Sequence, residues 1–453
     1  MKVAKFGGSS VADADQIRKV CAIITSDPER RVVVVSAPGR RHPKDTKVTD
    51  LLIACAEARI AGVSGREELD GVLARYREIA VALELDPEVM ENIETDLRRR
   101  LDGPTDDRDR FLDTMKAAGE DNCARLMAAA LRAGGAEARY VSPKEAGLVL
   151  TEEHGNARVL PESYENLAHL ADGEGIAVFP GFFGYSPEGR VVTLPRGGSD
   201  ITGSILAAAV QADVYENFTD VDCVFVTNPG VVPGARALDE LTYREMRELS
   251  YAGFGVFHEE ALEAVFHAGV PVCIKNTNNP DAPGTRIVHE RSCPIGAVSG
   301  IAADKGFCQI YVSKYLMNRE VGFGRRLLQI LEDEEISYEH TPSGIDNISV
   351  VLREQEFTEA AEQKIIRRIR DELEVDDVSV ERGLALVMIV GESMRRVVGT
   401  AAKACQAFAD AGVNLEMINQ GASEVSMMFG VKADDADNAV RALYDAFFKS
   451  PPA

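Results

Sequence analysis

The stretch Lys5-Phe6-Gly7-Gly8-Ser9-Ser10 follows the first apolar run of the chain and decides which fold we expect. Val3 to Phe6 is typical of a short strand, and Asp13 to Ser26 has helical periodicity. Two glycines between a strand and a helix leave backbone N–H groups beside the positive end of the helix dipole, which suits a phosphate. Lys5 adds a mobile positive charge. The stretch therefore predicts a phosphate site, although an ordinary tight turn has the same pattern.

The alternation of strand and helix continues through the first two-thirds of the chain. Four consecutive valines at 32–35 are typical of a strand buried on both faces. Thr49-Asp50 is expected to cap a helix, and residues 66–132 are expected to be helical. Further strand-like runs lie at 176–179, 191–194, 214–218, 224–226 and 270–274, and further helical stretches near 200–211, 242–252 and 259–269. The alternation predicts an open α/β sheet covered by helices.

A second glycine pair occurs in the stretch from Thr193 to Asp200, which reads TLPRGGSD. Arg196 can bind a carboxylate through two parallel hydrogen bonds. Ser199 or Asp200 is expected to cap the following helix, and for Asp200 this structural role is as plausible as a functional one. Glycine turns at two strand ends, one with a lysine and one with an arginine, predict an anion site on each half of a shared cleft.

Two further places carry weaker signals. Thr219-Asp220 ends a predicted strand and could meet a nucleotide, but a plain loop explains it equally well. Glu120 follows Gly119 in the middle of a long apolar helix. Glycine in a helix costs about 1 kcal/mol relative to alanine, so it can mark a helix face that approaches a ligand. Taken alone, however, the pattern around Glu120 favours a solvated carboxylate over a ligand contact.

Composition limits the classes of function. Across 453 residues the formal charge is −23, which repels nucleic acid and anionic lipid, so neither is an expected partner. The absence of Trp and the 6% of aromatic residues argue against a stacking surface for bases or sugars. The eight Cys stand singly, without metal-ligand spacing, and no apolar run is long enough to span a membrane. We expect a soluble cytoplasmic protein without a dedicated protein metal site.

The last third of the chain contains a repeat. Val321-Gly322 and Val398-Gly399 are 77 positions apart, and so are Ser349 and Ser426. Each repeat has the strand and helix order of a ferredoxin-like unit. We therefore predict three domains, at residues 1–296, 297–382 and 383–453.

Together these segments closely resemble the aspartate kinases of the amino acid kinase family. The opening stretch resembles that family's KFGG[TS]S signature, Thr193 to Asp200 its TLGRGGSD, and Thr219 to Gly230 its nucleotide segment. The tail from Ala303 resembles paired ACT regulatory domains, with Gln420 to Glu424 in the second. The resemblance implies a three-layer αβα fold with an open, mostly parallel sheet, followed by two ferredoxin-like (βαββαβ) ACT units.

The resemblance also implies a reaction, in which ATP and L-aspartate give ADP and 4-phospho-L-aspartate. This is the first step toward lysine, threonine and methionine, and Mg²⁺ accompanies the ATP. The catalytic residues implied are Lys5 and Asp200; the aspartate site Thr49, Glu120, Arg196 and Ser199; and the ATP site Lys5, Phe6, Gly7, Gly8, Phe218, Thr219, Asp220 and Phe225. An amino-acid effector, lysine or threonine or both, would bind at Met317, Gly322, Gly324, Thr341, Ser343 and Asp346. Paired ACT units imply a homodimer or a dimer of dimers.

Several positions depart from the family pattern. Pro195, Cys223 and Gly230 replace residues that are common in it, and 253–259 lacks the family's Lys and Pro. Residues 40–47 look like an insertion whose role the sequence leaves open. Two alternatives also remain open: a kinase of another small acid in the same family, and an amino-acid sensor that has lost its chemistry.

Overall fold

The computed structural model describes the chain except residues 256, 258, 293–297, 421–424 and 450–453. Cys293 and most of the 420–424 segment therefore lie outside the described residues. The chain forms two compact units. The first comprises Met1–Val224, Ala237–Ser250 and Gly255–Arg291, and the second comprises Phe225–Arg236, Tyr251–Phe254 and Ser292–Ala453. The boundary predicted after residue 296 thus misses two short segments that pack with the tail, because long-range packing leaves no local sequence signal.

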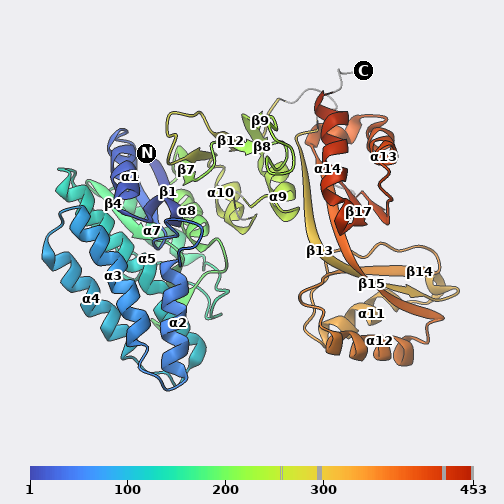
Figure 1. The fold of residues 1–453 in the computed structure, drawn as a ribbon, viewed down its shortest axis with the longest axis horizontal. Coiled ribbons are helices and arrows are strands. Elements are labelled where there is room, and N and C mark those ends of the chain that lie inside the picture. Colours follow the sequence, from blue (N-terminus) through green and yellow to red (C-terminus); the bar gives the residue numbers. More distant parts are fainter. Residues whose placement is uncertain (256, 258, 293–297, 421–424, 450–453) are drawn as a thin grey trace. The chain divides into compact units, whose positions relative to one another are not determined.

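The first unit is built on an eight-stranded sheet (Figure 1). Its strands follow the order β10 (Glu240–Thr242), β12 (Thr285–Val288), β11 (Val272–Asn276), β7 (Val214–Thr219), β1 (Lys2–Phe6), β2 (Arg30–Val35), β4 (Ile176–Pro180) and β3 (Ala138–Tyr140). All neighbours pair in parallel except β11 with β12. The expected open, mostly parallel sheet is confirmed.

The pleat of the central strands sorts side chains between two helical layers. Phe6 and Phe218 share a core cluster with α1 (Ala14–Thr25) and α5 (Arg108–Ala133). Their strand neighbours Lys5 and Asn217 contact Asp200 of α8 (Gly198–Ala209), as the period of two requires. The remaining helices of this unit are α2 (Val48–Ile60), α3 (Arg66–Ala82), α4 (Pro87–Leu101), α6 (Pro143–Ala146), α7 (Glu162–Leu167), α9 (Tyr243–Tyr251) and α10 (Leu262–Ala268). The three-layer arrangement is therefore confirmed.

Some expected elements differ in detail. β6 (Val191–Thr193) pairs with β5 (Phe183–Tyr185), and β8 (Val224–Phe225) pairs with β9 (Ala237–Leu238), so neither run joins the main sheet. The expected caps are wrong as well, because helical backbone begins earlier in each case. Lys47, not Thr49-Asp50, caps α2, and Gly197, with φ 82°, caps α8 in place of Ser199 or Asp200.

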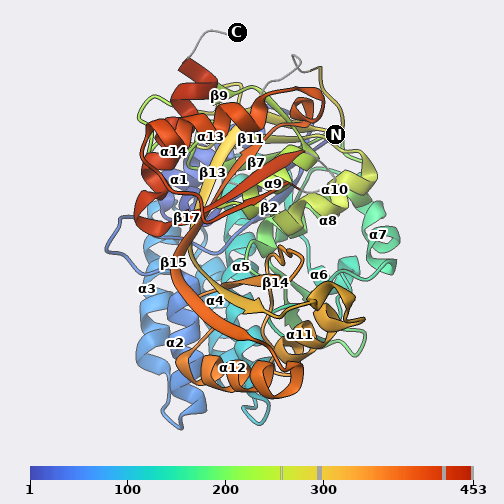
Figure 2. The same ribbon diagram turned by 90° about the vertical axis from the view of Figure 1, so that its right-hand side faces the viewer.

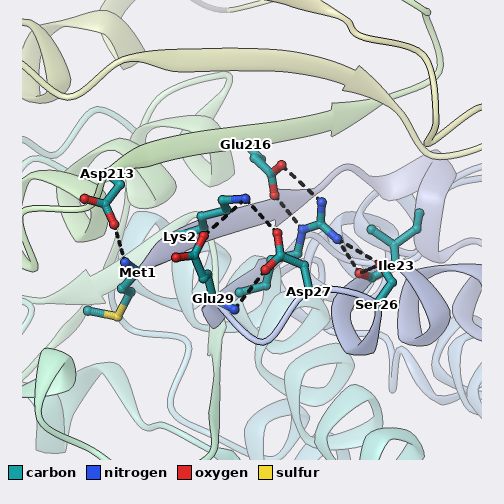
Figure 3. A network of polar contacts seen from close by, with 9 residues as sticks. Met1, Lys2, Ile23, Ser26, Asp27, Glu29, Asp213 and Glu216 are labelled. Atoms are coloured by element: carbon teal, nitrogen blue, oxygen red, sulfur yellow. Dashed lines mark hydrogen bonds and ion pairs between the residues drawn. The ribbon is translucent and has the colours of Figure 1, made fainter.

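Ion pairs tie the amino ends of the central strands together (Figure 3). Arg30 of β2 reaches Glu216 of β7 through two hydrogen bonds, of 2.6 and 3.1 Å. Lys2 Nζ lies 2.7 Å from Asp27 Oδ2, and the amino group of Met1 pairs with Asp213. These contacts fix the amino ends of β1, β2 and β7, and the candidate ligand site lies at their opposite, carboxyl ends.

The second unit contains a five-stranded antiparallel sheet. Its order is β14 (Asn347–Arg353), β13 (Gly300–Ser313), β15 (Asp377–Val390), β17 (Ser426–Lys432) and β16 (Met417–Asn419). Within this unit, α11 (Phe323–Glu332) and α12 (Glu359–Leu373) cover one end of the sheet. Figures 1 and 2 show α13 (Thr400–Asp410) and α14 (Ala436–Tyr444) at the other end. The repeat seen in the sequence therefore corresponds to two similar halves.

The two halves, which correspond to the two expected ACT units, share their long strands. β13 and β15 pair along both halves, and each contains a glycine with positive φ, Gly306 at 88° and Gly383 at 70°, near a shift in pairing register. The predicted division at 382/383 falls at this irregularity, but residues 300–305 pair with the second half of the sheet. No described helix is long and apolar enough to cross a membrane.

Candidate active site

A cavity of about 600 Å³ opens at the carboxyl ends of β1, β2 and β7. Gly8 and Ser9 follow β1, Ser36 to Gly39 follow β2, and Asp220 follows β7. The remaining lining comes from Arg40, His42, Pro43, Lys47, Thr49 and Glu120. Ligands of open parallel sheets bind at this edge, so the cavity is the candidate active site.

Lys5 is the cation held beneath this edge. It lies on β1, its exposed fraction is 7%, and its Nζ is 2.5 Å from Asp200 Oδ1. Asn217 Nδ2 donates to the same oxygen over 2.7 Å, so the carboxylate is held from two strands. A Cβ on Gly7 would stand 3.5 Å from Lys5 Nζ, which places the ammonium beside the glycine turn. The predicted partnership of Lys5 and Asp200 is present as an ion pair.

The glycines of the first turn are required by close backbone contacts. Gly39 N–H donates to the carbonyl of Gly8 over 2.8 Å, and a Cβ on Gly39 would lie 2.6 Å from Gly8 C. A Cβ on Gly8 would lie 3.0 Å from the carbonyl oxygen of Ala37. The turns after β1 and β2 therefore touch through backbone, leaving a narrow cradle at the cavity floor.

Glu120 is a buried carboxyl group in the cavity wall. It is 5% exposed on α5, and its Oε2 has no hydrogen-bond partner among the described residues. Burial raises the pKa of Glu120 to about 8, although hydrogen bonds at the backbone of Ala37 and Glu120 act in the opposite direction. An unpartnered buried carboxyl has a strong need for a cation or donor. Thr49, in the first turn of α2, lines the same cavity.

The second glycine turn begins α8. A Cβ on Gly181 would stand 2.6 Å from Ser199 Oγ, and Ser199 is buried. Arg196 is exposed in the turn and does not line the cavity described above. Asp113 fixes the strand before this turn, because its carboxylate accepts from Thr193 N at 3.0 Å and from Thr193 Oγ1 at 2.7 Å. No sequence pattern singles out Asp113, which is one helical acid among many.

The predicted nucleotide residues divide into two groups. Phe6 and Phe218 are fully buried and stack at 4.8 Å, so their side chains belong to the core and only their backbone could meet a ligand. Thr219 is half-buried, and Asp220 is exposed at the cavity. Phe225 belongs to the second unit. Both rings pack in the apolar core, so the prediction that Phe6 and Phe218 belong to the ATP site now concerns their backbone and stays a prediction.

The predicted effector residues lie in the first half of the tail. Met317 is buried in its hydrophobic core, and its predicted effector contact stays a prediction. Gly322, with φ 82°, starts α11, and Gly324 lies in its first turn. Asp346 Oδ1 accepts from Leu316 N at 2.8 Å, and Ser343 is exposed. Thr341 is half-buried nearby in sequence. Backbone geometry thus accounts for Gly322 without a ligand.

Basic residues beside the cavity were missed as site residues. Arg40, His42 and Lys47 line it, and they belong to the segment that the sequence marked only as an insertion. The signal was present, because the segment is basic in an acidic chain. The described residues contain no group of three or more His, Cys, Asp or Glu that could hold a metal ion.

Comparison with known proteins identifies relatives along the whole chain. Residues 1–276 match the amino acid kinase family, and residues 387–447 match an ACT domain. The chain is 57% identical over 448 residues to Aspartokinase 3 of Bacillus subtilis (strain 168), covering 99% of each. It is also 28% identical to an aspartokinase of Corynebacterium glutamicum, covering 98% of this chain and 95% of that protein.

The solved structures that resemble this chain are also aspartate kinases. An aspartate kinase from Clostridium acetobutylicum superposes with a TM-score of 0.86 at 36% identity, covering 99% of this chain and 100% of that one. Aspartokinase III of E. coli in complex with aspartate and ADP gives a TM-score of 0.79 at 27% identity, with the same coverage. The E. coli enzyme in complex with lysine and aspartate gives 0.77 at 26% identity, covering 99% of each chain.

Proposed function

The chain belongs to the aspartokinases of the amino acid kinase family, and from this premise we propose that its cavity is the site of aspartate phosphorylation. The γ-phosphoryl group of ATP passes to the side-chain carboxylate of L-aspartate, giving ADP and 4-phospho-L-aspartate. The observation that carries this assignment to the cavity is the ion pair of buried Lys5 with Asp200 beside a glycine cradle, with Glu120 in the cavity wall.

Charge is the main obstacle in this reaction, because a carboxylate must approach a triphosphate. Two unit charges 4 Å apart repel by about 4 kcal/mol at an effective dielectric constant near 20. The protein as a whole adds −23, so the compensation has to be local. Lys5 and the backbone N–H of Gly8 supply it, whereas the Gly7 N–H already donates to the carbonyl of Phe218 over 3.2 Å. Preorganised donors of this kind are how phosphoryl transfer is catalysed.

Asp200 acts on the reaction through Lys5. Its carboxylate holds the ammonium at 2.5 Å, and Asn217 fixes the carboxylate in turn. A lysine side chain has four rotatable bonds, so such a tether reduces the entropy lost when the transferring group arrives. Asp200 is therefore a positioning residue in this proposal.

The aspartate substrate would be bound by groups of opposite charge. Glu120 pairs with its ammonium, which gives the orphaned carboxyl oxygen a partner. Arg196 binds the α-carboxylate through its two-pronged guanidinium, while Thr49 and Ser199 donate hydrogen bonds. Arg196 would have to turn toward the cavity from its exposed position in the turn.

Mg²⁺ fits this cavity as a companion of the nucleotide. Such ions are held in kinases by substrate phosphates and one or two carboxylates, and Asp220 offers an exposed carboxylate at the cavity. When bound, the ion neutralises phosphate charge. The absence of a larger ligand cluster among the described residues is compatible with this arrangement.

The tail would carry regulation. Lysine accompanies aspartate in one related E. coli structure, which supports an amino-acid effector here, lysine or threonine or both. Its site in this proposal comprises the tail residues Met317, Gly322, Gly324, Thr341, Ser343 and Asp346. Association into a homodimer or dimer of dimers through the ACT units, and a cytoplasmic location, belong to the same proposal. Seven described cysteines are free thiols, which supports a reducing compartment.

The substrate can be tested by trapping the acyl phosphate with hydroxylamine. Purified protein, Mg²⁺ and ATP should give hydroxamate with L-aspartate and at least about tenfold less with L-glutamate, since one added methylene misplaces the carboxylate. A higher rate with another acid would overturn the assignment of aspartate. Binding of Mg-ATP without turnover of any acid would favour the silent sensor.

A further inference from the structure

The segment 40–47, between β2 and α2, is a basic wall of the cavity. Arg40, His42 and Lys47 line it, across from the backbone of Gly8 and Ser9. All three side chains are exposed, and among the described residues the Arg40 and Lys47 side chains make no ion pair. Two unpaired cations at a cavity in a chain of charge −23 indicate a place for an anion.

An ion-pair clamp holds this segment in shape. Arg75 of α3, only 5% exposed, places its Nη2 2.8 and 2.7 Å from the two carboxylate oxygens of Asp45. Arg41 also reaches Asp45, with Nε 2.9 Å from Oδ2 and Nη2 3.1 Å from Oδ1. Two guanidinium groups on one carboxylate hold the pKa of Asp45 well below its usual range, so the clamp stays charged.

The same arginine links the segment to the glycine cradle. Arg75 Nη1 donates to the carbonyl of Gly39 over 3.0 Å, and Gly39 N–H donates to the carbonyl of Gly8 over 2.8 Å. At the other end, Val48 N–H donates to the carbonyl of Pro38 over 3.1 Å and closes the base of the loop. The loop is thus fixed to α3 and to the turn after Lys5.

We propose that Arg40 and Lys47 bind phosphate oxygens of the nucleotide and that the Asp45–Arg75 pair positions them. The proposal rests on the proposed kinase function and gives the 40–47 insertion its role. Phosphate is favoured over the aspartate carboxylates because Gly39, directly before the segment, is bonded to Gly8 of the phosphate cradle. Asp45 and Arg75 touch no substrate and are positioning residues.

The direct test is nucleotide affinity in charge-removing variants. Lys47→Met and Arg40→Met should each weaken Mg-ADP binding, measured by calorimetry, and raise the KM for Mg-ATP by about tenfold, as expected for loss of a charge-assisted hydrogen bond. The KM for aspartate and the kcat should change less than about twofold. Lys44→Met, in the same loop but outside the cavity lining, is the matched control and should match the parent protein.

The positioning role needs a second readout. Asp45→Asn removes the charge of the clamp and should raise the KM for Mg-ATP about as much as Lys47→Met. The double variant Asp45→Asn/Lys47→Met should have a KM for Mg-ATP little higher than that of either single variant, because both changes remove the same contact with phosphate. A thermal melt of each variant separates this from loss of folding, and Asp45→Glu should restore part of the affinity.

Three outcomes would overturn the proposal: unchanged nucleotide affinity in Lys47→Met and Arg40→Met, multiplicative effects in the double variant, or a rise in the KM for aspartate alone. The last result would place the carboxylate of the substrate on this wall. If the proposed kinase function were wrong, the parent protein would form no hydroxamate. Calorimetry with Mg-ADP would still show whether Arg40 and Lys47 contribute to nucleotide affinity, so the two failures can be distinguished.

Discussion

Glu120 must change its charge state when its proposed ligand arrives. Its pKa of about 8 leaves the carboxyl mostly protonated at pH 7 in the free protein, whereas pairing with an ammonium group requires the carboxylate. Aspartate binding at pH 7 should therefore release close to one proton. Calorimetry in buffers of different ionisation enthalpy measures this release, and Glu120→Gln should abolish it together with most of the affinity.

The same group predicts a pH dependence of stability. The pKa of Glu120 is raised from 4.5 to about 8 by burial, so between these values the folded protein holds a proton that the unfolded chain lacks. The free energy of unfolding should fall as pH rises through this window. Relative to the parent protein, Glu120→Gln should gain a few kcal/mol, in order of magnitude, between pH 5 and pH 9. Denaturant titrations at both pH values check this, and an equal difference at both would contradict it.

Replacing Arg196 tests the aspartate site, because lysine changes the geometry of the hydrogen-bond donors while the positive charge is kept. Arg196→Lys keeps the charge but loses the two-pronged donor pattern, so the KM for aspartate should rise about tenfold. Steady-state kinetics with aspartate and ATP varied separately provide the measurement. A normal KM for aspartate would remove Arg196 from the site.

At the scale of elements, the contact of α5 with the strand end sets the position of Glu120. A Cβ on Gly119 would lie 2.7 Å from Ala37 Cβ and 3.3 Å from Leu52 Cδ1, so alanine must push α5 away. Gly119→Ala should raise the KM for aspartate several-fold even though alanine favours helix. Gly71→Ala in α3, whose added methyl would meet only Leu51 Cδ1 at 3.9 Å, is the control and should leave the KM unchanged.

The elements that could be predicted are those with a local signal. The valines of β2, the helical insert 66–132 and the two glycine turns are all encoded in short stretches and are present as expected. The pairing of β6 with β5 and the sharing of β13 and β15 between two halves depend on partners far along the chain. Hydrophobic periodicity is a local property of the sequence, so it does not indicate which distant strands pair.

The candidate site shows the same limit. Lys5 and Asp200 were predicted together through a family motif, and their ion pair is present. Asp45 and Arg75 are separated by 30 positions without a motif, so only the folded chain brings them together. Phe6 and Phe218 lie in motifs too, but the strand pleat turns their rings into the core.

For the whole molecule, the account predicts that effector response and catalysis can be separated. Lysine and threonine, added singly and together, should inhibit the parent protein in the hydroxamate assay. Ser343→Ala, at an exposed tail position, should weaken that inhibition several-fold without changing the KM for aspartate or ATP. Ser337→Ala, exposed in the same half of the tail, is the control. Equal inhibition in all three proteins would exclude Ser343 from the effector site.

The central claim is that Lys5 supplies the charge on which phosphoryl transfer depends. The most direct measurement is aspartyl hydroxamate formation by the parent protein and by Lys5→Met, with a thermal melt to confirm folding. The account predicts rapid formation by the parent and a loss of kcat of at least about 100-fold in the folded variant. Parent-like turnover by folded Lys5→Met would contradict it.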